Sequence, residues 1–353
     1  MQRQDFSSLA TPEFLNLGQG SWYHNKYDGR QYEVYIPLNY QVGTRVPLIM
    51  MLHGCAQFPL GFAYLAHMNL LADRHQFLVV YPHSLDLKDL DIGPCWNWYL
   101  GVNQHRGSGE PASLDGIVQA MLKNTSEWTV DPQRMYVAGV SAGACVAVNL
   151  GVTYPDLFAA IGVHSGGEYQ ARSLSFPLKQ SAAVGEKVQA QAAVETLRDQ
   201  QILLREEFIS VLHPGPDPIE QGEKAFQEMG SFARVMPTIV FHGTVDLIVD
   251  PINGEQVVRQ WLCTNQLASH GTFTASFEHP SSTTLSPAGP EGERPYTVFT
   301  WQDAHGSDVV TYWKVDEMGH AWSGGSPGSI YADPKGPDAS QAMYEFFMAH
   351  PLS

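Results

Sequence analysis

The sequence predicts an α/β protein in which a mostly parallel central sheet is flanked by helices. Short apolar runs without polar alternation, such as PLIMML (47–52), FLVVY (77–81) and PTIVF (237–241), are typical of parallel strands buried on both faces. Longer segments with helical spacing lie between these runs along most of the chain. Because parallel strands need crossover connections, this alternation favours a sheet with helices on its faces.

Seven segments are predicted to be strands of this sheet: Tyr32–Ile36, Pro47–His53, Phe77–Tyr81, Arg134–Val140, Ala159–His164, Pro237–His242 and Val309–Val315. Three segments have the spacing of helices: Ser113–Trp128, Ala142–Thr153 and Asn253–Leu262. The alternation of apolar and polar residues in TFTASFEH (272–279) and YTVFTW (296–301) predicts two further, antiparallel strands with a loop between them.

The chain is expected to form a single domain over residues 1–353. At about 150 residues per domain its length allows two, but α/β folds with insertions often use this length for one. Residues 165–236 include a charged, Ala- and Gln-rich helical pattern and no strong strand. We expect this stretch to be an insertion that packs over the sheet edge and forms a cap near the functional site.

Composition and charge exclude several classes of protein. Hydrophobic residues make up 44% of the 353 residues, which suffices for a sizeable core and excludes wholesale disorder. The 20 Lys and Arg residues against 36 Asp and Glu residues give a net charge of −16, which repels phosphate backbones and anionic lipid. We therefore expect no nucleic-acid or membrane partner. No apolar run approaches the ~18 residues that span a bilayer.

The cysteines, the histidines and the first residues lead to three further expectations. Four cysteines without C-x-x-C pairs are too few for a disulfide scaffold or a zinc site, although one bridge can form. No H-E-x-x-H pair occurs, so neither a metal nor another cofactor is expected. The initial MQRQDFSSLATPEF contains no apolar stretch, so no secretory signal peptide is expected within this chain.

The motif that carries most information is GVSAG (139–143), which matches G-x-S-x-G. It follows the apolar run MYVAGV and opens the helix-like run ACVAVNLGV. This strand–turn–helix context is that of the nucleophile elbow in α/β-hydrolases, where glycines permit a strained turn that exposes the serine hydroxyl. The motif therefore predicts that Ser141 is a nucleophile above a helix N-terminus, whose amides favour developing negative charge.

A serine hydroxyl needs a base to remove its proton, and in this fold the acid and the base follow in the order Ser, Asp, His. Asp246 comes soon after the predicted strand Pro237–His242 and is the expected acid. Asp250 is the local alternative, but its place before a proline is more typical of a turn or a helix start. His320 lies among glycines after the last predicted strand and is the expected base.

In such a reaction the oxyanion accepts two hydrogen bonds from backbone amides. One amide belongs to the loop after an early strand, and the other belongs to the residue after the nucleophile. The motif HGCAQ (53–57) begins where an early predicted strand ends. We therefore assign the two donors to the amides of Cys55 and Ala142. His53 can orient or polarise this loop, but a histidine that closes a strand is more often structural, so it receives no proton-transfer role.

Seven motifs occur in order between residue 52 and residue 340: LHGCAQ, CWNWY, RMYVAGVSAGA, YPDLFAAIGVHSG, FHGTVDLIVDPINGEQVV, MGHAWSGG and YADPKGPDAS. Together they resemble the poly(3-hydroxybutyrate) depolymerase family of esterases, and most of all its short-chain-length polyhydroxyalkanoate depolymerases. The resemblance implies an α/β-hydrolase fold, no metal, and hydrolysis of polyester or related carboxylic esters by a secreted enzyme. Carried over by position, it implies Ser141 as nucleophile, Asp246 as acid and His320 as base.

The resemblance to secreted enzymes also bears on the cysteines, because oxidation is permitted outside the cell. Cys55 and Cys95 belong to the HGC and CWNW motifs, which are expected at the rim of the site. We expect these two residues to form a disulfide that ties the two loops together. Cys145 and Cys263 lie on predicted helices and are expected to be free core thiols.

Four aromatic residues are candidates for substrate binding: Trp96, Trp98 and Tyr99 in CWNWY, and Trp322 two residues after the expected base. Aromatic walls beside a catalytic triad suit an uncharged, apolar acyl or polyester segment. The alternative interpretation is that these rings belong to the core, and the sequence does not decide which of Trp96 and Trp98 faces inward.

These observations predict a serine esterase that hydrolyses short-chain 3-hydroxyalkanoate polyester or its oligomers, so the expected partner is a polyester or a small ester. Within enzymes, the alternatives are an esterase for feruloyl or acetyl groups on plant polysaccharide, an esterase for an aromatic polyester, and a peptidase. A binding protein of the same fold without turnover is the alternative from another class. The presence of Ser, Asp and His in the required order argues against it.

Overall fold

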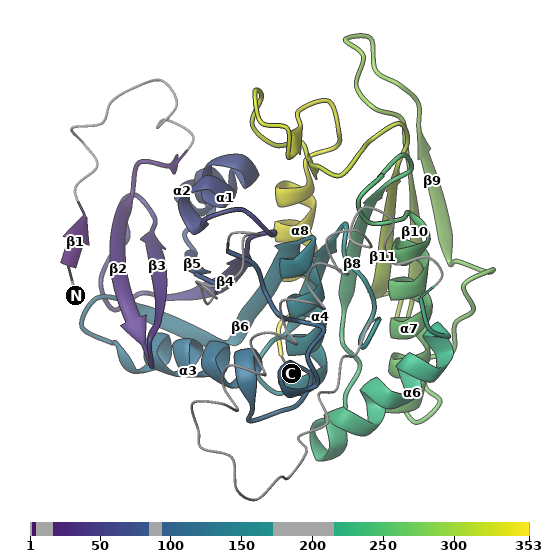
Figure 1. The fold of residues 1–353 in the computed structure, drawn as a ribbon, viewed down its shortest axis with the longest axis horizontal. Helices are drawn as coiled ribbons and strands as arrows, with labels where there is room; N and C mark the ends of the chain where they lie inside the picture. Colours follow the sequence, from purple (N-terminus) through teal and green to yellow (C-terminus); the bar gives the residue numbers. More distant parts are fainter. Residues whose placement is uncertain (1, 5–16, 85–93, 172–214, 353) are drawn as a thin grey trace, which may run out of the picture.

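The computed structural model describes residues 2–4, 17–84, 94–171 and 215–352 (Figure 1). Its centre is a run of neighbouring parallel strands in the order β5 (Leu78–Pro82), β4 (Arg45–Leu52), β6 (Thr129–Val140), β7 (Ala160–His164), β8 (Thr238–Gly243) and β11 (Asp308–Val315). Antiparallel strands extend both ends of this run: β3 (Arg30–Ile36), β2 (Ser21–Tyr27) and β1 (Gln2–Gln4) beyond β5, and β10 (Tyr296–Gln302) and β9 (Ser282–Ser286) beyond β11. The predicted mostly parallel sheet is confirmed, and each of the seven segments predicted as strands overlaps one of its strands.

Helices cover both faces of the sheet and close two apolar cores (Figure 1). One face carries α1 (Pro59–Ala66), α2 (Met68–His75) and α8 (Ala339–Met348). The other face carries α3 (Gly109–Lys123), α4 (Ala142–Thr153), α6 (Pro218–Met229) and α7 (Ile252–Ala268). Among the described helices, none is long and apolar enough to cross a bilayer.

Parallel strands place all their carboxyl ends at one edge of the sheet, and this edge gathers the predicted functional loops. The HGC motif follows β4, Ser141 follows β6, Asp246 follows β8 and His320 follows β11. The segment between β11 and α8 also packs against α1, because the Ser326 amide donates to the Leu65 carbonyl at 3.0 Å. Segments more than two hundred residues apart in the sequence therefore lie together there.

The prediction of a strand over TFTASFEH (272–279) is wrong, while its partner YTVFTW (296–301) is confirmed as β10. In the first segment, only an isolated bridge joins Ser276 and His279. Its apolar residues pack as side chains instead: Phe273 is buried, and the Phe277 ring stacks on Trp301 with the ring centroids 5.8 Å apart. The outer neighbour of β10 is instead the mostly polar strand β9. Its Ser- and Thr-rich sequence has no alternation of apolar and polar residues from which a strand could be predicted.

The predicted cap over residues 165–236 falls mostly on residues 172–214, which lie outside the described residues, so it stays a prediction. Its described end forms α6, which packs on α7 rather than over the sheet edge. The two helices approach closely at Gly222, where a Cβ atom would lie 2.7 Å from the Cβ of Cys263. The single domain over the whole chain likewise remains an expectation.

We predict that Phe347→Ala lowers the free energy of unfolding by about 3–5 kcal/mol, because it empties a large site in a closed core. The Phe347 ring is fully buried and stacks on Tyr136 with the centroids 4.9 Å apart. Chemical denaturation measures the loss. The matched control is Met348→Ala, at a partly buried position next along α8, and it should cost clearly less.

Candidate active site

Ser141 occupies a strained turn between β6 and α4. Its backbone has φ 57° and ψ −124°, a combination that L residues rarely adopt, and its amide donates to the His164 carbonyl at 2.9 Å. The flanking glycines are required by contact distance: a Cβ on Gly139 would lie 2.4 Å from Gly143, and one on Gly143 would lie 2.2 Å from the Leu52 carbonyl oxygen. The turn is therefore compressed between its own helix and the end of β4.

Asp246 and His320 form a hydrogen-bonded pair at the same edge. His320 Nδ1 lies 2.8 Å from Asp246 Oδ2, while the amides of Ile248 and Val249 each donate to Asp246 Oδ1 at 2.9 Å. An ionised carboxylate only accepts hydrogen bonds, so His320 carries its proton on Nδ1. This tautomer leaves Nε2 as the basic nitrogen of the ring.

A second histidine, His242, supports the same carboxylate, and sequence reasoning missed it. Its Nε2 donates to the Val249 carbonyl at 2.9 Å and lies 3.5 Å from Asp246 Oδ2. Burial raises the pKa of Asp246, but hydrogen bonds from His242 and His320 lower it by more, so the pKa lies well below the usual range. The carboxylate is therefore ionised at neutral pH. The only sequence signal was a histidine at the strand end, four residues before the aspartate.

Asp250, the alternative acid, lies in a different position. Its carboxylate accepts from the Ile252 amide at 3.0 Å, and its carbonyl accepts from the Asn253 amide at 2.9 Å. These contacts are typical of a residue that begins a helix, here α7. The structure thus brings Asp246, rather than Asp250, against His320.

The nucleophile turn and the base loop meet at His164, another residue that sequence reasoning did not assign. The His164 carbonyl accepts from Ser141, and its ring Nε2 accepts from the Ser323 amide at 3.0 Å. Burial lowers the pKa of His164 to about 3, so the ring is neutral and can accept this bond. Within the described residues, no direct hydrogen bond joins the Ser141 hydroxyl to His320. Catalytic hydrogen bonds of this kind often tighten only when substrate is bound.

The two predicted oxyanion donors are the amides of Cys55, which follows Gly54 in the HGC loop, and of Ala142, which follows Ser141 in the chain. A Cβ on Gly54 would lie 3.4 Å from the Ser141 Cβ, so the HGC loop contacts the nucleophile turn. Ala142 is the first residue of α4, where helix amides have no intrahelical partner. In the described part of the chain, neither amide donates a hydrogen bond to another protein group.

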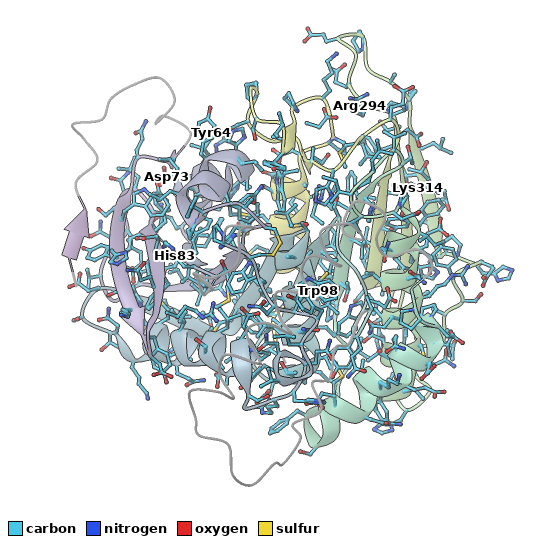
Figure 2. All side chains as sticks on the ribbon, in the orientation of Figure 1. Tyr64, Asp73, His83, Trp98, Arg294 and Lys314 are labelled. Carbon is cyan, nitrogen blue, oxygen red and sulfur yellow. A yellow bond between two sulfur atoms is a disulfide. The ribbon has the colours of Figure 1, made fainter. Side chains whose placement is uncertain are left out.

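The predicted disulfide and the two free thiols are confirmed, but the prediction that Cys263 is a core thiol is wrong, because its side chain is only partly buried. Cys55 and Cys95 form a disulfide, which ties the HGC loop to the aromatic loop and is drawn as a yellow bond in Figure 2. Cys145 and Cys263 are free thiols, of which only Cys145 is fully enclosed. Within the described ranges, no group of three or more His, Cys, Asp or Glu side chains is arranged to hold a metal ion.

The expectation of an exposed aromatic wall is wrong for the four predicted rings, because all are buried: Trp96, Trp98, Tyr99 and Trp322. The Trp322 ring stacks on His164 with the centroids 4.8 Å apart and meets Phe62 edge-on at 5.3 Å. Its indole nitrogen donates to Ser340 Oγ at 3.2 Å. The place of Trp322 next to the base in the sequence did not reveal that its ring points into the core, where it packs between His164 and Phe62.

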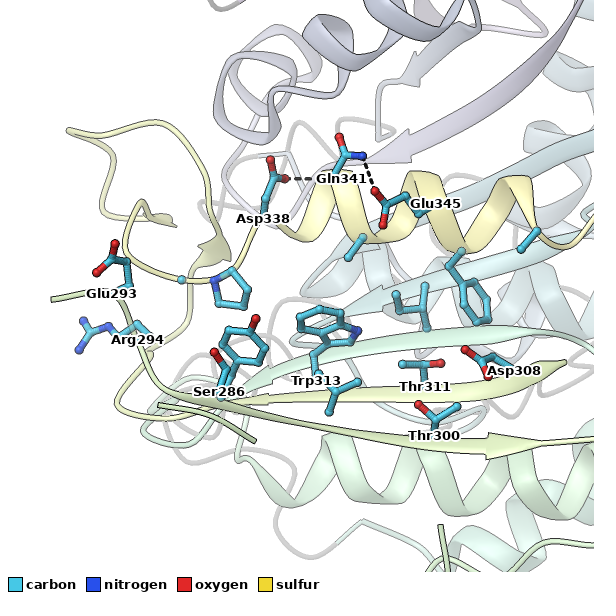
Figure 3. Close-up of a pocket in the computed structure, with 18 of the residues that line it drawn as sticks. Ser286, Glu293, Arg294, Thr300, Asp308, Thr311, Trp313, Asp338, Gln341 and Glu345 are labelled. Carbon is cyan, nitrogen blue, oxygen red and sulfur yellow. Dashed lines mark hydrogen bonds between the residues drawn. The ribbon is translucent and has the colours of Figure 1, made fainter. Parts of the chain in front are cut away.

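A large cavity lies elsewhere, between α8 and the face of β10 and β11 (Figure 3). It has a volume of about 1080 Å³, and Thr300, Thr311, Trp313 and Gln341 are among its lining residues. None of the predicted site residues lines it.

Comparisons with known proteins support an esterase family. The family model described as "Esterase PHB depolymerase" matches residues 30–194, which include the HGC motif and Ser141. Poly(3-hydroxyalkanoate) depolymerase C of Paucimonas lemoignei is 27% identical over 281 residues, or 78% of this chain and 55% of that protein. An acetylxylan esterase of Coprinopsis cinerea is 26% identical over 251 residues, or 69% of this chain and 56% of that protein.

This chain thus spans about half the length of those relatives. Among solved structures, an acetyl xylan esterase from Aspergillus awamori superposes with a TM-score of 0.64 at 18% identity, covering 94% of this chain and all of that one. At that identity the likeness concerns the fold, which is that of the α/β-hydrolases. Over residues 30–194 and over the aligned part of the depolymerase relative, the chain is thus similar to the PHB depolymerase esterases.

Proposed function

We propose that the chain is a serine esterase that uses Ser141, His320 and Asp246 to hydrolyse aliphatic polyester of short-chain 3-hydroxyalkanoates and its oligomers. Two things support the catalytic part: the strained serine turn, and the Asp246–His320 pair with its basic nitrogen free of the carboxylate. The match to the family model "Esterase PHB depolymerase" supports ester hydrolysis as the reaction. An extracellular site of action, which the disulfide favours, belongs to the same proposal.

The proposed reaction proceeds through an acyl-enzyme. His320 Nε2 takes the proton of the Ser141 hydroxyl as its oxygen attacks the ester carbonyl, and Asp246 stabilises the imidazolium that forms. The amides of Cys55 and Ala142 stabilise the oxyanion of the tetrahedral intermediate. His320 then protonates the departing alkoxide. Water repeats both steps, releasing the acid and restoring the serine.

Exposed apolar side chains on the same loops are the reason that we propose a polyester, rather than a polysaccharide ester, as the substrate. Phe58 follows the HGC loop, Leu247 adjoins Asp246, and Ile330 lies on the connection after His320. Leu247 is 86% exposed and Ile330 is 84% exposed, values at which an isolated loop residue gains nothing from being apolar. Val245 and Ile248, which flank the same aspartate, are also exposed. We call Phe58, Val245, Leu247, Ile248 and Ile330 the apolar rim.

A groove near α1 extends the apolar character of this edge. It has a volume of about 570 Å³ and is lined mainly by Leu17, Leu60, Tyr64 and Pro327. Apolar surface that surrounds a reactive group is typical of a site for an apolar partner. A solid aliphatic polyester offers such a surface, whereas a hydrated polysaccharide does not.

A second candidate, deacetylation of xylan, is favoured by the relatives named as acetylxylan esterases. It uses the same proposed triad, so only products separate the two functions. The deciding experiment compares release from a poly(3-hydroxybutyrate) film, soluble 3-hydroxybutyrate oligomers, acetylated xylan, feruloylated xylan and p-nitrophenyl esters. Release from acetylated xylan alone among the natural substrates would overturn the polyester proposal.

We predict that Ser141→Ala lowers kcat on a p-nitrophenyl ester by about 10⁶-fold without unfolding the chain, because the nucleophilic oxygen is lost. A continuous colorimetric assay and circular dichroism measure the two properties. Labelling by a fluorophosphonate should disappear in the same variant. Activity within tenfold of the parent would remove Ser141 from the mechanism.

Asp246→Asn should lower kcat by about 10⁴-fold, because an amide no longer enforces the proton on His320 Nδ1. The matched control is Asp250→Asn, which alters the same functional group four residues away at the start of α7. The control should retain kcat within a few-fold and lose only some stability. The reverse pattern would identify Asp250 as the acid.

The double variant Leu247→Ser/Ile330→Ser should adsorb to a poly(3-hydroxybutyrate) film at least about tenfold more weakly, because it loses two apolar contacts. Its kcat/KM on soluble p-nitrophenyl butyrate should change little. Depletion of protein from solution over the film measures adsorption. Leu285→Ser provides the control, since Leu285 is 76% exposed but lies on the edge strand β9. Equal loss of adsorption in both variants would refute a role specific to the apolar rim.

A further inference from the structure

The peptide unit between Gly54 and Cys55 contains both the proposed oxyanion donor and a well-held carbonyl. Because this unit is planar and trans, the Cys55 N–H and the Gly54 C=O point in opposite directions. The Gly54 carbonyl accepts from His53 Nδ1 at 2.8 Å and from the Gln57 amide at 3.3 Å. Whatever fixes this carbonyl therefore fixes the direction of the donor.

His53 can serve this purpose because its ring has one orientation and one tautomer. The ring is buried, and its Nε2 accepts from the Ser84 amide at 3.2 Å, so the proton lies on Nδ1. Burial lowers the pKa of His53 to about 4, which keeps the ring neutral and this arrangement intact at neutral pH. A hydrogen bond to a carbonyl also polarises its peptide and strengthens the N–H at the other end.

Trp96 holds the backbone on the other side of the loop. Its indole N–H donates to the His53 carbonyl at 2.8 Å, and its ring lies 5.3 Å from the imidazole, centroid to centroid. Trp96 is fully buried, so this hydrogen bond has no water to compete with it. Trp96 thus holds the peptide before Gly54 and His53 holds the peptide after it, while Gln57 Oε1 also accepts from the Gly54 amide at 2.8 Å.

A buried ion pair fixes Trp96 in turn. The Arg30 guanidinium lies 5.2 Å from the Trp96 ring centroid and 3.8 Å from Glu110. Glu110 Oε2 also accepts from the Asn97 amide, the residue after Trp96, at 3.1 Å. Arg30 and Glu110 are buried, and ion pairs in such places add little net stability, since desolvation offsets their attraction. Their contacts with Trp96 and with the Asn97 amide favour a role in orienting the Trp96 ring.

We propose that His53 and Trp96 are positioning residues that aim the Cys55 amide at the oxyanion, and that the Arg30–Glu110 pair sets the orientation of Trp96. This inference rests on the proposed function, because it requires an oxyanion at Ser141. In the alternative account, the disulfide alone orients the Cys55 amide. The bond between Cys55 and Cys95 constrains the side chain of Cys55, whereas the hydrogen bonds on either side of Gly54 constrain the peptide that carries the donor.

The test is Trp96→Phe, which keeps an aromatic ring and removes only the indole N–H. We expect kcat on p-nitrophenyl butyrate to fall about tenfold, with KM within twofold, since the oxyanion exists only after attack. The affinity for an alkyl boronic acid, whose anionic tetrahedral adduct on serine places a boronate oxygen at the oxyanion position, should fall by the same factor. A loss confined to the transition state is not expected from a general weakening of the fold.

Trp128→Phe is the matched control, because the Trp128 indole is equally buried and donates to the Met121 carbonyl at 2.9 Å. It deletes the same kind of hydrogen bond away from the HGC loop. We expect it to lower the melting temperature about as much as Trp96→Phe does while kcat and boronate affinity stay within twofold of the parent. Equal kinetic losses in both variants, or none in Trp96→Phe, would overturn the proposal.

His53→Phe supplies a second variant should Trp96→Phe fail to fold. It removes the donor to the Gly54 carbonyl and should cost kcat and boronate affinity about 10- to 100-fold, again with KM nearly unchanged. An unchanged kcat in folded His53→Phe would also overturn the proposal. Failure of the proposed function gives a different result: the parent protein itself would then neither bind the boronic acid nor react with a fluorophosphonate.

Discussion

The turn at Ser141 is the constraint on which the site depends. A serine held at φ 57° is strained, at a cost on the order of 1–3 kcal/mol, and it persists only when its surroundings leave no alternative. Those surroundings are backbone: Gly143 lies against the end of β4, and the Ser141 amide is bound by the end of β7. Three neighbouring parallel strands thus set the position of one hydroxyl. The same close approach brings the HGC loop next to it.

Hydrogen-bond partners, rather than the degree of burial, decide which buried groups at this edge are charged. His164 is enclosed and neutral, and it acts as an acceptor and as a stacking surface between Phe241 and Trp322. Asp246 is equally enclosed but receives hydrogen bonds on both oxygens, which keeps it ionised. The ring of His320 is thereby the one titratable group of this set that combines a carboxylate partner with an accessible second nitrogen. The contacts of each side chain, more than its residue type, therefore determine whether it is neutral, ionised or able to accept a proton.

The sequence predicted the parts of this arrangement that depend on local pattern. Continuous apolar runs gave the parallel strands, and chain order with strand ends indicated Ser141, Asp246 and His320. Features set by packing between distant segments were not predictable in this way. Trp322 is buried because α1 and α8 close over it, which no spacing around the base reveals. The edge strand β9 owes its existence to pairing with β10, since its own residues are mostly polar and exposed.

The disulfide between Cys55 and Cys95 adds a dependence on redox conditions. Bonds of this kind form and persist in oxidising compartments and are rare where glutathione and thioredoxin keep thiols reduced. A newly made chain in a reducing cytosol therefore holds its HGC loop by hydrogen bonds alone. The covalent tie between the HGC loop and the aromatic loop forms only under oxidising conditions. An ester in a reducing compartment would consequently meet a less ordered form of this site than an ester in an oxidising one.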